Sequence, residues 1–164
     1  MKRLAWIGIL IAVAALAGCT AQDEKPKATP VSAAEDDAYQ TAVFAEARAK
    51  WEVKAAQGDI QSQRQLGVMY LLGQGIDTDY AMALEWFNKA AAQGEDIAQY
   101  QLGIMYADGK GVAQSNVQAH MWYSLAAQQG NGSARAHLDE LTEQMTAEEI
   151  AEAQGLADDW TPTL

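Results

Sequence analysis

The sequence predicts an all-α fold built from antiparallel helix pairs, and three observations carry this prediction. A short marker containing Ala and Gln recurs at steps of 36 residues, and longer motifs between the markers recur at the same step. Each resulting unit has the pattern of a helix, a Gly-rich turn and a second helix. Such units are expected to stack, because one helix pair cannot bury its apolar face alone.

Residues 1–18 have the pattern of a secretory signal peptide. Lys2 and Arg3 precede an uncharged, mostly apolar run over residues 4–17, which is too short for a comfortable membrane span. The sequence Leu-Ala-Gly-Cys at residues 16–19 resembles the lipobox of bacterial lipoproteins, where cleavage precedes the cysteine. The resemblance implies a covalent lipid on Cys19. We expect no other cofactor. An uncleaved anchor helix with an incidental cysteine is the alternative.

The segment after the cysteine predicts a flexible tether over residues 19–35. It is rich in Ala, Thr, Ser and Pro and has no apolar periodicity. Residue 20 is Thr rather than Asp, which by resemblance to enterobacterial sorting rules favours the outer membrane. We therefore expect a chain anchored in the cell envelope by its lipid, with its folded part facing the periplasm. Cys19 is the only cysteine, so no intramolecular disulfide is possible.

The repeat step comes from motifs that occur in register. The Gly-ended marker is at residues 55–58, 91–94 and 127–130, and the Leu-Gly-[Val/Ile]-Met-Tyr motif is at residues 66–70 and 102–106. Full repeats are predicted over residues 59–94 and 95–130. Gly67 and Gly103 carry no Cβ, so we expect a neighbouring helix to approach closely there. The residues predicted to be structural in the repeats are Leu66, Gly67, Tyr70, Gly73, Gly75, Trp86, Gly94, Leu102, Gly103, Tyr106, Gly109, Gly111, Trp122 and Gly130.

Each second helix is expected to begin after an N-cap residue and to end at a glycine. Asp79 and Ser115 occupy the same repeat position, and both residue types accept a hydrogen bond from the first turn of a helix. Gly58, Gly94 and Gly130 suit the residue after the helix end. The residues that this helix is expected to bury are Ala83, Trp86 and Ala90 in one repeat, and Ala119, Trp122 and Ala126 in the next.

Incomplete units flank the two repeats. Residues 36–57 are predicted to be a leading second helix, and residues 131–145 a further first helix with Leu138 in register with Leu66 and Leu102. Thr146 and Glu149 form a capping box that predicts a last helix through Trp160, covering the open apolar face. The stripe expected to pack in the leading helix is Tyr39, Val43, Ala47, Trp51 and Ala55.

These motifs closely resemble the SEL-one-like repeat (SLR), a relative of the tetratricopeptide repeat. The resemblance rests on L-G-x-M-Y-x-x-G-x-G-[IV] followed by W-[FY]-x-x-A-A-x-Q-G, as they stand twice in this chain. It implies a short right-handed α-solenoid of about seven helices over residues 36–164. It also implies a scaffold or adaptor rather than an enzyme.

The residues give little support to catalysis or to metal binding. His120 and His137 are interpreted as structural or surface histidines, because a metal site needs several converging ligands. No Ser, His and Asp spacing indicates a nucleophile, and the Gly-x-Gly turns lack the residues of a phosphate loop. Acidic residues outnumber basic ones by 22 to 11, which argues against nucleic acid as a partner.

The first helices are the expected protein-binding elements. In tetratricopeptide-like stacks these helices line the concave side, and their non-consensus positions bind. The alternative is that the apolar members of this set simply pack between adjacent first helices. The candidate partner-binding residues are Gln61, Arg64, Val68, Leu71, Leu72, Ile97, Tyr100, Ile104, Ala107 and Asp108.

The leading hypothesis is a periplasm-facing adaptor that holds an envelope protein or peptide close to the membrane. A cell-wall-directed enzyme or inhibitor is a second hypothesis, weakened by the lack of a convergent catalytic set. A third is a structural lipoprotein that assembles with copies of itself through its open ends.

Overall fold

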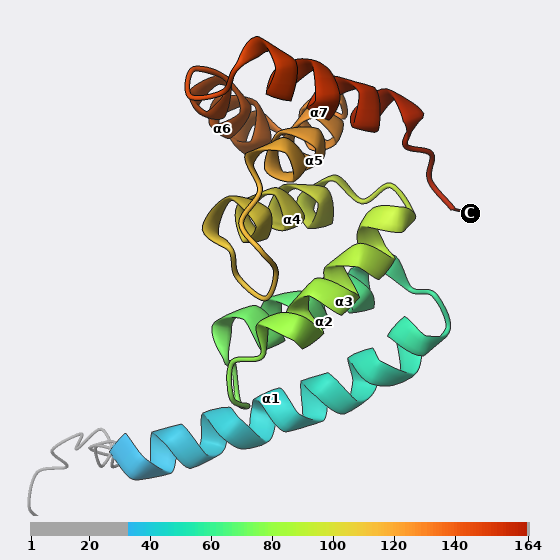
Figure 1. Cartoon of the computed structure of the whole chain (residues 1–164). Coiled ribbons are helices and arrows are strands. Elements are labelled where there is room, and N and C mark those ends of the chain that lie inside the picture. Colours follow the sequence, from blue (N-terminus) through green and yellow to red (C-terminus); the bar gives the residue numbers. More distant parts are fainter. Residues whose placement is uncertain (1–32, 164) are drawn as a thin grey trace, which may run out of the picture. The chain divides into compact units, whose positions relative to one another are not determined.

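The computed structural model describes residues 33–163, with side chains from residue 38 onward (Figure 1). The predicted signal peptide and Cys19 lie outside these residues. None of the helices within the described part is both long enough and apolar enough to cross a membrane. The helices are α1 (Ala33–Ala56), α2 (Ile60–Leu72), α3 (Tyr80–Ala92), α4 (Asp96–Asp108), α5 (Asn116–Gln128), α6 (Gly132–Thr142) and α7 (Ala147–Asp159).

The predicted all-α solenoid of antiparallel helix pairs is confirmed in the described residues. Helices α2 and α3 form the pair of the first repeat, and α4 and α5 form the pair of the second. Consecutive pairs stack through α3 against α4, with α1 on α2 and α6 on α5 (Figure 1). From α1 to α6 each helix therefore packs on its neighbours in the chain, as a linear repeat array requires. Helix α7 is the exception.

Side chains at the helix starts fix the repeat boundaries. Asp79 accepts a hydrogen bond from Met82 N–H, and Ser115 accepts one from Gln118 N–H, so both predicted N-caps are confirmed. At the other end of the first helices, Gly73 and Gly109 adopt the left-handed conformation, with φ of 68° at each. The predicted turn and C-terminal glycines with positive φ are Gly58, Gly73, Gly75, Gly94, Gly109, Gly111 and Gly130.

The two helices of each pair meet at a glycine, as predicted. A Cβ built on Gly67 would lie 2.6 Å from Cε1 of Phe87, and one on Gly103 would overlap the Tyr123 ring. Phe87 is fully buried and Tyr123 is 2% exposed. The prediction that Trp86 is the buried aromatic of α3 was wrong. Phe87 faces Gly67 instead, and Trp86 is half-buried with Lys89 Nζ 4.1 Å from its ring.

Helix α7 packs on α5 rather than on α6, which precedes it. Its capping box of Thr146 and Glu149 is confirmed. Under this cover α5 buries nine consecutive residues, 119–127, whereas α3 buries only one side of its surface. The chain after α7 adds two contacts, because the Trp160 ring lies 6.1 Å from Trp122 and Thr163 N–H donates to the carbonyl of Ala92.

The leading helix differs from its prediction in two respects. It begins at Ala33, so residues 33–35 belong to α1 and not to the predicted tether. The expected stripe holds only in its later part: Ala47 and Trp51 are half-buried and Ala55 is buried, whereas Tyr39 and Val43 are 67% and 43% exposed. Phe44 takes their place, half-buried, and its Cβ lies where a side chain on Gly75 would be.

Candidate protein-binding surface

The predicted binding residues fall into two groups on the first helices α2 and α4. Leu72 and Ile97 are 60% and 38% exposed, so their side chains are available to a partner. Val68 and Leu71 are half-buried and pack on the core shared by the two repeats. Ile104, like Ala107, packs on the core of the second repeat.

Arg64 forms an ion pair with Glu95 and a hydrogen bond with Gln61. Its Nε lies 3.1 Å from Glu95 Oε1, and its Nη2 donates to Gln61 Oε1 over 2.7 Å. The Arg64 side chain is 20% exposed and that of Glu95 is 9% exposed. The pair joins the first helix of one repeat to the start of the next, and a substitution at Arg64 would leave a buried carboxylate without its partner.

Three aromatic rings from three helices meet beside α4. The centroid of Tyr100 lies 5.9 Å from that of Tyr123 and 5.5 Å from that of His137, and the Tyr123 and His137 rings are 5.5 Å apart. Tyr100 was a predicted binding residue, whereas Tyr123 and His137 were not. Comparing the repeats singles out Tyr100, since α4 carries it where α2 carries Arg64, but gives no sign of the other two rings.

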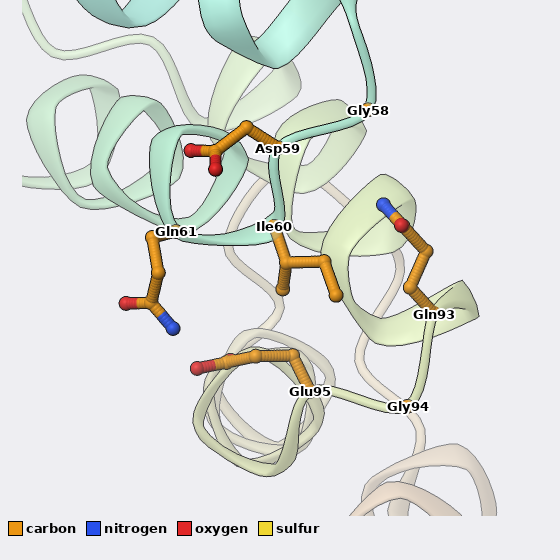
Figure 2. A pocket seen from close by; sticks show the side chains of 7 residues that line it. All are labelled: Gly58, Asp59, Ile60, Gln61, Gln93, Gly94 and Glu95. Carbon is orange, nitrogen blue, oxygen red and sulfur yellow. The ribbon is translucent and has the colours of Figure 1, made fainter.

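A shallow pocket of about 520 Å³ lies where α2 and α4 begin and α3 ends (Figure 2). Its lining includes Asp59, Ile60, Gln61, Gln93 and Glu95. Figure 2 shows Ile60 projecting into the middle of this set, with the Gln61 and Glu95 side chains extending to the same side. The pocket is open and mixed in character, which suits a surface contact better than an enclosed small molecule.

The two carboxylates of this pocket are helix caps. Asp59 Oδ1 accepts the Ser62 N–H over 2.8 Å, and hydrogen bonds from Ser62 lower the pKa of Asp59. Burial raises the pKa of Glu95, opposed by the hydrogen bond from Ala98 N–H and the charge of Arg64. Opposite shifts of two nearby acids are found in acid–base catalysis. Here each carboxylate accepts a hydrogen bond from a backbone N–H, Asp59 from Ser62 and Glu95 from Ala98, as expected of helix caps.

The two histidines have different surroundings. His120 is 3% exposed, its Nδ1 lies 3.3 Å from Ser124 Oγ, and burial lowers its pKa. His137 is exposed on α6, with its Nδ1 2.9 Å from the carbonyl of Ser133. Residues 33–163 contain no group of three or more His, Cys, Asp or Glu side chains placed to hold a metal ion.

The repeats match a known family. The Sel1 repeat model matches residues 60–95 and 96–131, one residue later than the predicted repeat bounds. A solved Sel1 repeat protein from Oxalobacter formigenes is 39% identical, with a TM-score of 0.53, and the match covers 55% of this chain and 68% of that one. This chain belongs to the Sel1 repeat family. No curated protein sequence matches it significantly.

A second solved structure extends the likeness beyond the two Sel1 repeats. It is a protective antigen present in uropathogenic Escherichia coli strains, which displays an SLR fold. The two are 29% identical with a TM-score of 0.66, and the match covers 74% of this chain but 28% of the antigen's length. Sel1 repeats generally mediate contacts between proteins, and proteins built from them are typically non-catalytic scaffolds.

Glutamine pairs with one buried member each tie the Sel1 repeats together internally. Gln93 Nε2 donates to Gln63 Oε1 over 2.8 Å, and Gln129 Nε2 donates to Gln99 Oε1 over 2.7 Å. Gln63 is 5% exposed and Gln99 is fully buried. Sequence reasoning used the outer glutamines only as repeat markers and missed their partners. The signal was available, because Gln63 and Gln99 are themselves one repeat apart.

Proposed function

We propose that this Sel1 repeat protein is an envelope-anchored adaptor, which holds a partner protein or peptide on its first helices. The observation that carries the proposal is the exposure of Leu72 and Ile97 on α2 and α4, within a repeat family that serves protein contacts. Exposed apolar side chains next to polar ones are common at interaction sites. The two carboxylates of the pocket at the starts of α2 and α4 serve as helix caps, which favours binding over catalysis there.

The anchor part of the proposal rests on the sequence. The lipobox at residues 16–19 supports lipid attachment at Cys19 after removal of residues 1–18, and Thr20 favours the outer membrane. Metabolic labelling with a radioactive fatty acid tests it. We expect label on the wild-type chain and none on Cys19→Ala, which should accumulate as the longer precursor. Label retained by Cys19→Ala would contradict lipid attachment at this residue.

The adaptor part is tested by crosslinking in living cells followed by purification of the full chain. We expect a Leu72→Ser/Ile97→Ser variant to lose a protein that the wild type captures. Both side chains are exposed, so the variant should remain folded by circular dichroism. Val53→Ser/Leu156→Ser is the matched control, because these residues are 62% and 36% exposed on α1 and α7. Equal capture by both variants would contradict binding on the first helices.

A further inference from the structure

The aromatic strip consists of Tyr100, Tyr123 and His137, together with Ile97 and Ile104 on either side of Tyr100 along α4. Tyr123 forms its buried base, Tyr100 is half-buried, and His137 is exposed at the edge on α6. Ile97 is exposed and Ile104 is half-buried. From Ile97 to Ile104 the strip is about 10 Å long, which is the length of about three residues of extended chain.

Carboxylates surround this strip. Asp108 and Glu140 lie near enough to Tyr123 to add to the rise in its pKa, whose main cause is burial. Asp108 pairs with Lys110 Nζ over 2.9 Å, while the exposed Glu140 has no ion pair among the described residues. Asp96, at the start of α4, accepts a hydrogen bond from Asn131 and carries a further negative charge. The surface around the rings is therefore acidic, as is the whole chain at a net charge of −11.

An aromatic face in an acidic surface, with the carboxylate of Glu140 nearby and unpaired within residues 33–163, favours a cationic side chain over other types. A guanidinium or ammonium group gains from the negative face of a tyrosine ring and from the nearby carboxylates together. An acidic segment would be repelled by the same carboxylates, and a purely apolar one would leave them desolvated without a partner. The isoleucines on both sides favour an apolar residue next to the cation.

We propose that the aromatic strip binds a short extended segment of a partner protein in which an arginine or lysine adjoins an apolar residue. The cation lies between Tyr100 and Glu140, and the apolar residue contacts Ile97 or Ile104. This inference rests on the proposed adaptor function and names the chemistry of its partner.

Peptide arrays test the proposal with defined probes. Three sets of nonapeptides share the same mixture of Gly, Ser and Ala flanks around a central Leu-Arg-Leu, Leu-Gln-Leu or Leu-Glu-Leu. The fluorescently labelled full chain in detergent is applied at low salt. We expect the arginine set to retain about tenfold more protein than the glutamine set, and the glutamate set to retain least. Retention by the arginine set should fall as salt is raised.

Variants of the chain locate the binding. Glu140→Gln and His137→Ala each change an exposed residue, so neither should unfold the protein, and both should lower retention by the arginine set several-fold. Glu152→Gln on α7 removes the same charge from an exposed site away from the strip and should leave retention unchanged. Circular dichroism confirms that each variant is folded.

Two results would overturn the inference. One is equal retention by the three peptide sets, and the other is full retention by Glu140→Gln and His137→Ala. If the crosslinking experiment still yields a protein that Leu72→Ser/Ile97→Ser loses, the adaptor function stands and only the cationic partner is rejected. If neither experiment yields a partner, both are rejected.

Discussion

Replacing Gly67 by alanine tests how closely the two helices of a repeat approach. The new Cβ would lie 2.6 Å from Cε1 of Phe87, where 3.4–4 Å is ordinary contact, so the fully buried ring has to move by about 1 Å. Such overpacking costs about 1–3 kcal/mol. The higher helix propensity of alanine relative to glycine stabilises the protein by about 1 kcal/mol. We expect a net loss of about 0–2 kcal/mol in the free energy of unfolding.

Gly155→Ala is the matched control for this substitution. Gly155 lies inside α7, and a Cβ there would meet no atom within 4 Å. The same chemical change should therefore stabilise the protein by about 0.5–1 kcal/mol. Urea unfolding followed by circular dichroism measures both variants. The two variants should differ by about 0.5–3 kcal/mol, with Gly67→Ala the less stable.

A double mutant separates the Phe87 contact from other effects of the alanine. Phe87→Leu makes room beside residue 67, so combining it with Gly67→Ala should cost less than the sum of the two single changes. We expect a favourable coupling of about 0.5–1 kcal/mol. Two outcomes would refute the close approach: Gly67→Ala as stable as Gly155→Ala, or strictly additive effects in the double mutant.

Three further predictions concern buried contacts. Gln129→Ala should cost about 1–3 kcal/mol in urea unfolding, because it leaves Gln99 Oε1 buried without its donor; an unchanged midpoint would show that the pair is not needed. Because burial lowers the pKa of His120, the unfolded chain binds more protons below about pH 6.5, so the free energy of unfolding should fall from about pH 7 toward pH 5. His120→Leu should flatten that slope, and the same slope in both proteins would contradict the assignment. Trp160→Ala should cost about 2 kcal/mol and shift tryptophan emission to the red by exposing Trp122, whereas unchanged emission and stability would show that the contact contributes nothing.

The repeat register allowed most of the fold to be predicted, since recurring motifs fix which residues are equivalent. It did not determine which of two adjacent aromatics points inward. Trp86 and Phe87 are about 100° apart on the helix, and only the position of Gly67 on the facing helix selects Phe87. Trp51, in register with Phe87, was the available hint.

The sequence did not predict that α7 packs on α5, and the physical reason is a different one. Past residue 131 the chain departs from the consensus, so register no longer indicates which helix a segment contacts. The candidate site shows the same limit. Leu72 and Ile97 were named from repeat positions, but the meeting of Tyr100 with Tyr123 and His137 depends on three helices whose spacing the sequence does not state.

The fit of α7 to α5 has a consequence for how this array can change in length during evolution. A repeat inserted after α5 would separate α7 from the helix whose outer surface it covers, exposing residues such as Trp122 and Leu125 that are buried now. Duplication of residues 60–95 would instead keep the α5–α7 contact intact and lengthen the row of first helices. Related chains of different length should therefore vary upstream of α5 and keep their last helices in common.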